Sequence, residues 1–178
     1  MNGMVLVMQA AEFAAHRHTG QRRKGEAGEP YVNHLAEVAR LLADATDGAD
    51  ADLIAAGWLH DTVEDTGTSA AEIETFFGPR VAGLVIEVTD DKSLPQAERK
   101  RLQVEAAPHK SAAAKTLKIA DKTSNLRALM LSPPADWPSE RILDYVDWAE
   151  KVVAGCRGVN PALEAVFDET LDRARKVL

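Results

Sequence analysis

The sequence predicts an all-α fold of about eight to nine helices or more. Apolar residues recur at the i, i+3, i+4, i+7 spacing of an amphipathic helix through most of the 178-residue chain. Helix-start signals stand in front of several of these stretches. Residues 84–89 form the one candidate strand, but their apolar spacing suits a helix and no hairpin partner follows them.

Segments rich in Gly, Pro and polar residues divide the expected helices. They lie near residues 19–29, 48, 66–68, 78, 93–95, 108–111, 132–138 and 158. Two amphipathic helices follow such breaks, with apolar stripes at Leu35, Val38, Ala39 and Leu42 and at Val81, Leu84, Val85 and Val88. Start signals are Asp50 before a stretch over residues 53–63, a Ser69–Glu72 capping box, and Asn160 before Pro161. We expect one domain over residues 1–178.

Composition narrows the class of protein. With 46% hydrophobic residues, a folded chain of this length buries roughly 70% of its unfolded surface, which is enough for a core without disulfides. The 21 Lys and Arg against 28 Asp and Glu give a net charge of −7, which disfavours indiscriminate binding to nucleic acid. A polyanionic ligand must therefore be met by a local group of cations.

Cysteine usage and the N-terminal residues predict a cytoplasmic protein. Cys156 is the single cysteine, so we expect no internal disulfide and no thiolate cluster for zinc or iron–sulfur. The first apolar residues have no basic segment before them and are interrupted by Gln9 and Glu12. That pattern fits neither a secretion signal nor a membrane span, so no contact with a membrane is expected.

Four side chains able to bind a metal interrupt the apolar faces of three expected helices: His34, His60, Asp61 and Asp121. Burial of such groups without partners would be costly. Any one of them alone would more often be a satisfied polar group of the core than a ligand. Together, two imidazoles and two carboxylates without thiols suit a divalent ion such as Mn2+, Fe2+, Co2+ or Zn2+, with open positions for water and substrate.

Two acids follow the His-Asp pair. Glu64 stands four residues after His60, and Asp65 four residues after Asp61, so helical spacing places each acid one turn beyond a candidate ligand. At that position a carboxylate can handle protons for a metal-activated water. The alternative is an ordinary acidic helix end. Because the macrodipole disfavours acids at a helix C-terminus, the pair indicates a local requirement.

Cations occur in two groups. Arg22, Arg23 and Lys24 lie in a glycine-flanked loop, where they could hold phosphates or simply be solvated. The second group is Lys92, Arg99, Lys100 and Arg101, of which helical spacing allows at most one or two to serve a ligand. The remaining histidines, His16, His18 and His109, are interpreted as structural or surface groups.

Four segments together resemble a known family: HRHTGQRRKGEAGEPYVNH, WLHDTVEDT, VTDDKSLPQAERKRLQ and KIADKTSNLRAL. They are similar to the HD-domain hydrolases of the RelA/SpoT kind, and most closely to the stand-alone small members called metazoan SpoT homologues. The similarity runs from about Val5 to Asp172. It implies hydrolysis of guanosine 3′,5′-bis(diphosphate), ppGpp, and of its pentaphosphate pppGpp. Pyrophosphate would leave the 3′ position to give GDP or GTP, which ends stringent-response signalling.

The resemblance also implies a role for each residue set. In the family, the matching metal ligands bind Mn2+, and here they are His34, His60, Asp61 and Asp121. The pair Glu64 and Asp65 would serve the water and the leaving group. Positions near the nucleotide, its ribose and its phosphates would be taken by Arg23, Lys24 and Asn125, with Lys92 helping to neutralise the phosphates.

Two other functions remain open at this stage. A phosphatase acting on NADPH or another nucleotide could use the same metal site. A sensor could bind ppGpp without catalysis, although the intact Glu64 and Asp65 speak against it, since a binder needs no proton relay. The sequence leaves open the oligomeric state, the details of a guanine pocket and the physiological metal.

Overall fold

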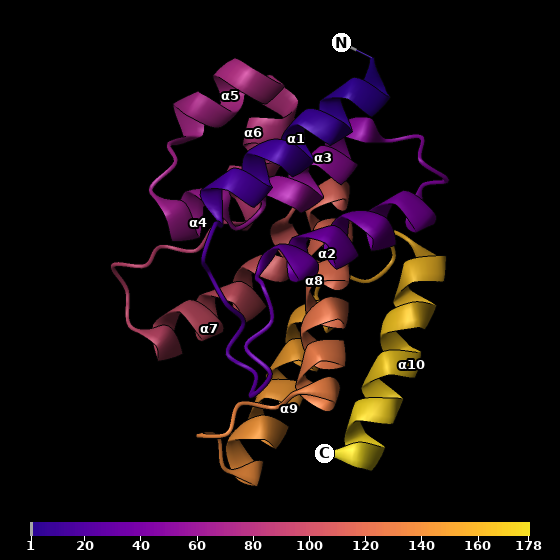
Figure 1. Ribbon diagram of the computed structural model, residues 1–178. Helices are drawn as coiled ribbons and strands as arrows, with labels where there is room; N and C mark the ends of the chain where they lie inside the picture. The colour runs from indigo at the N-terminus through magenta and orange to yellow at the C-terminus, as the bar shows by residue number, and fades with distance from the viewer. Residues whose placement is uncertain (1) are drawn as a thin grey trace.

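The computed structural model describes residues 2–178 and confirms the all-α prediction (Figure 1). Within that range the regular elements are ten α-helices and one 3-10 turn; the only β contact is an isolated bridge between Arg22 and Pro30. The elements are α1 (Gly3–Arg17), α2 (Val32–Ala45), α3 (Ala51–Leu59), α4 (Thr62–Thr66), α5 (Ala70–Phe77), α6 (Pro79–Val88), α7 (Gln96–Ala106), η1 (Ala107–His109), α8 (Ala112–Leu131), α9 (Ser139–Ala154) and α10 (Pro161–Val177). No helix among these residues is long and apolar enough to cross a membrane.

The predicted helix starts are confirmed in atomic detail. The Asp50 carboxylate accepts a hydrogen bond from the Leu53 amide at 3.1 Å, which caps α3. Ser69 and Glu72 form the reciprocal hydrogen bonds of a capping box at the start of α5. At the start of α10, the Asn160 side chain accepts from the Leu163 amide at 3.0 Å.

One predicted helix is divided. The sequence predicted a continuous helix over residues 53–63 with the acid pair near its C-terminal end, but α3 ends at Leu59 and α4 begins at Thr62. Glu64 and Asp65 therefore lie in the first turn of the short helix α4, and the expectation that they stand at the C-terminal end of a long helix is wrong. Apolar spacing runs on through the break without a Gly or Pro, so the sequence carries no local signal for it.

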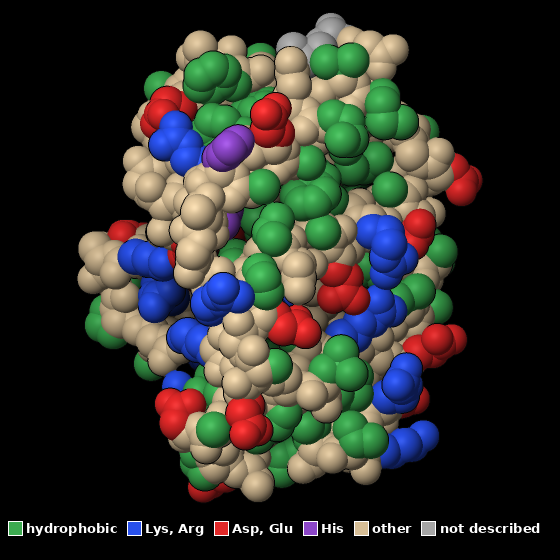
Figure 2. Space-filling view, in the orientation of Figure 1, with side chains coloured by type: hydrophobic (Ala, Val, Ile, Leu, Met, Phe, Trp, Pro, Cys, Tyr) green, Lys and Arg blue, Asp and Glu red, His purple; other side chains and the backbone are tan. Residues whose placement is uncertain are grey.

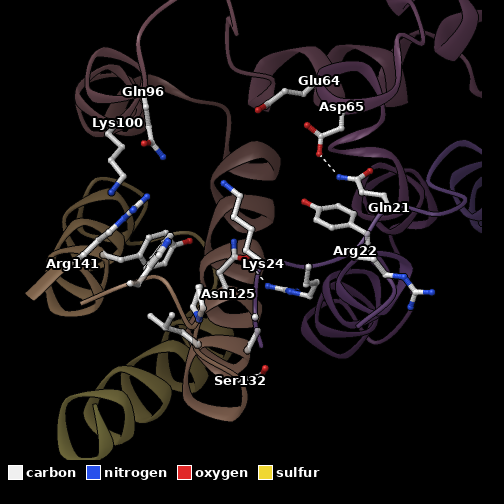
Figure 3. Close-up of a pocket in the computed structure, with 18 of the residues that line it drawn as sticks. Gln21, Arg22, Lys24, Glu64, Asp65, Gln96, Lys100, Asn125, Ser132 and Arg141 are labelled. Carbon is white, nitrogen blue, oxygen red and sulfur yellow. Dashed lines mark hydrogen bonds between the residues drawn. The ribbon is translucent and has the colours of Figure 1, made fainter. Parts of the chain in front are cut away.

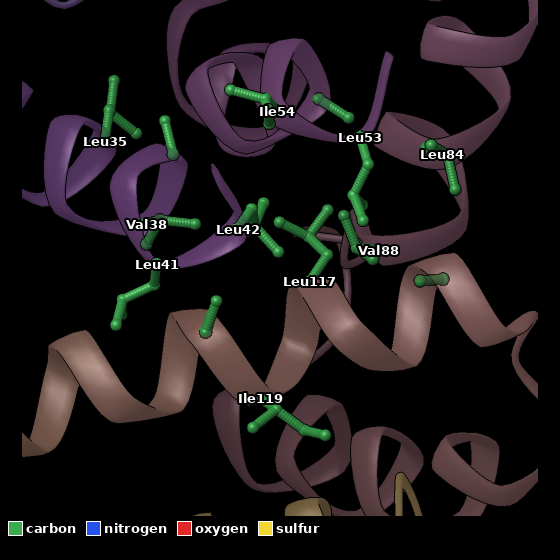
Figure 4. Close-up of a cluster of buried hydrophobic side chains, with 14 of the residues drawn as sticks. Leu35, Val38, Leu41, Leu42, Leu53, Ile54, Leu84, Val88, Leu117 and Ile119 are labelled. Atoms are coloured by element: carbon green, nitrogen blue, oxygen red, sulfur yellow. The ribbon is translucent and has the colours of Figure 1, made fainter. Parts of the chain in front are cut away.

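Helix α8 runs through the centre of the fold, between the α2–α3 layer and the pair α9–α10 (Figure 1). Leucines and β-branched residues of four helices pack against one another above it, as Figure 4 shows, and Ile119 points from α8 to the other side. The labelled side chains of this cluster are Leu35, Val38, Leu41, Leu42, Leu53, Ile54, Leu84, Val88, Leu117 and Ile119. Because other helices cover α8 on both sides, polar residues of α8 are buried as well, and some of them form part of the site.

The α1–α2 loop is fixed against the end of α8. The Ala27 amide donates to Ser132 Oγ at 2.8 Å, and the Glu26 amide donates to the Pro133 carbonyl at 3.2 Å. At Gly25 a Cβ would stand 2.2 Å from the Ser132 carbonyl oxygen, so only glycine allows this approach. The loop that carries the first group of cations is therefore held beside α8.

Gly57 sets the distance between α2 and α3. A Cβ there would lie 2.6 Å from Leu42 Cδ1 and 3.2 Å from Ala39 Cα. We expect Gly57→Ala to lower the free energy of unfolding by about 1–3 kcal/mol, because the two helices must move apart. Gly83→Ala is the matched control: its Cβ meets nothing within 4 Å, and alanine in α6 should raise stability by roughly 0.5–1 kcal/mol. Urea denaturation measures both, and equal stability of the two variants would contradict this packing.

Candidate functional site

Three buried side chains form a compact cluster that could hold a metal ion. His34 lies in the first turn of α2, His60 lies between α3 and α4, and Asp121 lies midway along α8. One ligand atom from each lies within 4.8 Å of the others. Asp121 Oδ1 is 3.3 Å from His34 Nε2 and 3.8 Å from His60 Nε2.

The fourth predicted ligand, Asp61, lies beside this cluster. Its Oδ2 atom is 3.0 Å from His60 Nε2 and 3.7 Å from His34 Nε2. The Tyr31 hydroxyl donates to the same oxygen at 2.6 Å, which fixes the carboxylate. The structure thus brings together all four residues that the sequence singled out as candidate ligands.

Hydrogen bonds fix the orientation of both imidazoles. His60 Nδ1 donates to the Gly57 carbonyl oxygen at 2.8 Å. His34 Nδ1 lies 2.9 Å from Ser124 Oγ, and Ser124 donates its single hydrogen to Glu37 Oε2 at 2.7 Å. The serine must therefore accept from His34 Nδ1–H. Both Nε2 lone pairs face the centre of the cluster, as metal ligation requires.

The residues fit a divalent ion. His60 Nε2 is buried and makes no hydrogen bond of good geometry, although carboxylate oxygens of Asp61 and Asp121 lie 3.0 and 3.8 Å from it. Burial alone would lower the pKa of His60, but the charges of Asp61 and Asp121 outweigh it and raise that pKa to about 9. The two carboxylates therefore attract positive charge to this nitrogen. A divalent ion supplies that charge, and two imidazoles with two carboxylates suit it.

Lys122 stabilises the carboxylate of Asp121. Its Nζ donates to Asp121 Oδ2 at 2.9 Å. Burial would raise the pKa of Asp121, but Lys122 and the two imidazoles hold it well below its usual value. Asp121 is thus ionised and ready to ligate, and Nζ of Lys122 in turn lies 4.4 Å from the centre of the Trp148 ring.

The two acids of α4 lie in different surroundings. Glu64 Oε2 accepts from the Asp90 amide at 3.1 Å, and burial raises the pKa of Glu64. Asp65 accepts from Gln21 Nε2 at 2.8 Å and forms an ion pair with Lys92. A carboxyl with a raised pKa is better matched to proton transfer near neutral pH, so Glu64 is the stronger candidate for that role.

A cleft of about 510 Å³ opens beside the cluster (Figure 3). In Figure 3, Glu64, Asp65 and Gln21 form one wall, Gln96, Lys100 and Arg141 form the opposite wall, and Lys24 extends between them. Asn125 lies at the back. The cleft is large enough for a nucleotide and carries cations on both sides.

Cations of the first group lie where the sequence predicted a phosphate site. Arg22, Arg23 and Lys24 all line the cleft. Arg23 donates to Asn125 Oδ1 at 2.8 Å, and Asn125 Nδ2 donates to Asp121 Oδ1 at 2.7 Å, which connects the loop to the ligand cluster. Figure 2 shows Lys and Arg side chains gathered at the left of this face, beside the α1–α2 loop.

The second group of cations differs from its prediction. The sequence allowed at most one or two to face a ligand, yet Lys92, Arg99 and Lys100 all line the cleft. Arg101 alone turns away and pairs with acids of α7. The difference arises because Lys92 precedes α7 and is free of the helical spacing. Its charge is already balanced by Asp65, so it is a weaker phosphate contact than the sequence indicated.

Sequence reasoning missed the aromatic wall of the cleft. Trp137 and Tyr145 have ring centres 5.9 Å apart, and Tyr145 and Trp148 have ring centres 5.2 Å apart. Arg141, Tyr145 and Trp148 follow the i, i+4, i+7 spacing, so one stripe of α9 was available as a signal. Tyr31, three residues before His34, was missed in the same way.

The other histidines agree with their interpretation. His18 is buried and stacks on Tyr31 with ring centres 5.3 Å apart, while His16 and His109 are exposed. His18 also contacts Gln21, at 2.6 Å between Nδ1 and Oε1. It therefore supports two residues of the site without reaching the ligand cluster itself.

A family model, individual protein sequences and a solved structure all show similarity between this chain and one family. The family model described as "HD domain" matches residues 10–142. The mouse protein named guanosine-3′,5′-bis(diphosphate) 3′-pyrophosphohydrolase MESH1 is 48% identical over 93% of this chain and 93% of its own length. The human protein of that name is 51% identical over 89% of this chain and 88% of its own. The solved structure of a metazoan SpoT orthologue, described as hydrolysing ppGpp, matches with a TM-score of 0.91 and 46% identity over 97% of each chain.

Ser124 offers a test of the ligand cluster. With Ser124→Ala, His34 Nδ1 loses its partner, so we expect the affinity for Mn2+, used as a probe ion, to fall by about 10- to 100-fold. Thr123→Val is the control, because the Thr123 hydroxyl is equally buried on α8 but donates to the Ile119 carbonyl instead. Electron paramagnetic resonance of free Mn2+ measures both affinities. Unchanged Mn2+ affinity in Ser124→Ala would show that His34 needs no such support.

Proposed function

The chain belongs to the HD-domain family and, within it, to the guanosine-3′,5′-bis(diphosphate) 3′-pyrophosphohydrolases of the MESH1 type, and from this premise we propose that it hydrolyses ppGpp and pppGpp. The reaction releases pyrophosphate from the 3′ position and leaves GDP or GTP. Such an enzyme ends stringent-response signalling. Its partner is a small nucleotide, and residues 1–178 act as one metal-dependent phosphohydrolase domain, which we expect in the cytoplasm.

One observation carries this proposal. The candidate ligands and the acid pair adjoin one cation-lined cleft, in a chain about half identical to pyrophosphohydrolases over nearly its whole length. A shared fold alone does not establish which reaction a protein catalyses. Here the residues of the site and the sequence similarity both support the same reaction. A sensor without catalysis would need neither the half-buried Glu64 nor the cluster around His60.

We propose Mn2+ as the ion held by His34, His60, Asp61 and Asp121. When bound, it would supply Lewis-acid chemistry by lowering the pKa of a water and offsetting phosphate charge. The protein's own contribution is to fix the ligands. Ser124 and the Gly57 carbonyl orient the two imidazoles, and Tyr31 orients Asp61.

The acids manage the protons of the reaction. Hydrolysis places a water oxygen on the phosphorus attached to O3′ and breaks that phosphorus–O3′ bond, so the water loses a proton and O3′ gains one. We assign proton transfer to Glu64, because its pKa is raised by burial while the Asp90 amide fixes its position. Asp65, fixed by Gln21 and Lys92, supports the water and the leaving group.

The cleft accommodates the rest of the nucleotide. Trp137 and Tyr145 line the cleft with their rings tilted by 49° to each other, and a purine can stack on the face of one of them. Arg23, Lys24 and Asn125 lie between these rings and the ligand cluster, where ribose and phosphate groups would pass. This arrangement would orient the nucleotide with its 3′ phosphates towards His60 and Asp61.

Product analysis tests the reaction. We expect purified protein, stripped of metal and reloaded with Mn2+, to convert ppGpp into GDP and pyrophosphate, identified by chromatography. Orthophosphate as the sole inorganic product, from ppGpp or from NADPH, would instead indicate a phosphatase. Failure to turn over either compound with any divalent ion would leave a non-catalytic ppGpp sensor as the better function.

The division of roles between ligands and acids makes a second prediction. Glu64→Gln keeps the size of the side chain but cannot take a proton, so turnover should fall by roughly 10²- to 10⁴-fold while Mn2+ stays bound. His60→Ala removes a ligand, so bound Mn2+ and activity should fall together. Glu74→Gln, an exposed acid of α5, is the control for loss of charge. If Glu64→Gln lost its metal as completely as His60→Ala, Glu64 would be a ligand.

A further inference from the structure

A polar chamber lies beneath the cleft, between α7 and α8. It has a volume of about 200 Å³, is partly open to solvent, and reaches the ligand cluster at Asp61 and Asp121. A second hollow of about 170 Å³ lies behind it, and the two share the side chains of Asp90, Arg99, Gln103 and Lys118. These four residues therefore form a wall of the chamber close to the candidate metal centre.

One face of α8 is polar along this chamber. Lys118, Asp121, Lys122 and Asn125 follow the i, i+3, i+4, i+7 spacing, and all four line it. Apolar residues of α8 such as Leu117, Ile119 and Leu126 are buried in the core, and Lys118, Asp121 and Lys122 are buried with them. Two lysines thus flank the carboxylate of Asp121, in a chamber that Asp61, Glu64 and Asp90 also line.

The two lysines differ in their partners. Lys122 pairs with Asp121 at 2.9 Å. Lys118 is equally buried, but among residues 2–178 its Nζ makes one hydrogen bond, to the Val88 carbonyl at 3.1 Å, and no ion pair. A buried ammonium with three donors and one neutral acceptor is under-satisfied. Burial accordingly lowers the pKa of Lys118.

Arg99 faces the same chamber with an unused donor. Its Nε is buried and has no hydrogen-bond partner. The nearest carboxylate contact, from Arg99 Nη1 to Glu64 Oε1, is 3.8 Å, which is too long for a hydrogen bond. Gln103 Oε1 in the shared wall is also unpartnered. The Asp90 carboxylate in the same wall already accepts from Gln103 Nε2. Two cations and one unpartnered acceptor fit a group with several oxygens that carries negative charge and can hold a proton.

We propose that Lys118 and Arg99 form a subsite for the outer phosphate of the 3′-diphosphate and retain the pyrophosphate after cleavage. This assignment rests on the proposed function for the identity of the substrate. The inner phosphate must lie at the ligand cluster to react, so the outer phosphate needs a place beyond it. Of the three lysines that line the chamber, Lys122 is already paired with an acid and Lys100 lies over the rings of Tyr145 and Trp148. This leaves Lys118, beside Arg99, to meet the outer phosphate. The subsite favours a diphosphate over a monophosphate.

Calorimetry with inorganic pyrophosphate tests the subsite without requiring turnover. Pyrophosphate, premixed with one equivalent of Mn2+ so that it does not strip the protein, is titrated into the Mn2+-loaded chain. Lys118→Met should weaken binding by about tenfold or more, as expected for a lost charge-assisted hydrogen bond. Lys110→Met is the matched control: Lys110 donates to the neighbouring Glu87 carbonyl but lies outside the chamber. Its pyrophosphate affinity should stay within about twofold of the wild type.

Arg99→Gln provides an independent variant, because the Arg99 side chain is 25% exposed and its replacement need not disturb the core. It should also weaken pyrophosphate binding, with bound Mn2+ unchanged. Wild-type affinity in both Lys118→Met and Arg99→Gln would overturn the subsite, as would an equal loss in Lys110→Met. A wild-type protein that binds pyrophosphate through Lys118 but fails to hydrolyse ppGpp would retain the subsite and reject the proposed reaction.

Discussion

The fold depends on the burial of a polar ligand set where α2, α3, α4 and α8 meet. His34, His60 and Asp121 are each less than a tenth exposed, and such groups are costly to remove from water without partners. Hydrogen bonds to Ser124 and the Gly57 carbonyl, together with the ion pair to Lys122, reduce that cost. His60 Nε2 makes no hydrogen bond and lies within 3.8 Å of carboxylate oxygens of both Asp61 and Asp121, a position that suits a bound cation.

Charge in the cleft is less positive than its cations suggest. The chain carries a net charge of −7, and the cleft gathers arginines and lysines from the α1–α2 loop and α7. Lys92, which lies just before α7 and also lines the cleft, is neutralised within the protein by Asp65. Attraction for a polyanion therefore comes from the cations that lack an acidic partner. A count of lysines and arginines in the sequence cannot identify them, since pairing is decided by the tertiary structure.

Much of the fold could be predicted because local rules govern it. Asp50, Ser69 and Asn160 cap helices as expected, since each cap depends on residues within one turn. The four candidate ligands were found because polar residues interrupted apolar periodicity. The break between His60 and Thr62 left no such trace, because contacts with other helices produce it and no Gly or Pro marks it.

Side chains that meet the ligand from distant elements were harder to predict. Tyr31 and Trp137 join the site only because the loop and α9 pack against α8, and no spacing along the chain connects them to Asp121. The role of Lys118 was hidden for a different reason. The sequence around Lys118 resembles that of any amphipathic helix. Lys118 stands out only in the structure, where Lys122 pairs with an acid and Lys118 does not.

Two adjacent residues of α8 support the ligand cluster in opposite directions. Ser124 connects His34 to Glu37, whose other oxygen accepts from Arg127 at 3.0 Å, while Asn125 connects Asp121 to Arg23 of the cleft loop. Since neighbours on a helix point about 100° apart, both contacts form together at only one rotation of α8. The apolar core fixes that rotation through residues such as Leu117. A site needs its supporting side chains placed to within about 0.5 Å. By fixing the rotation of α8, core packing therefore determines where the candidate metal ligands lie.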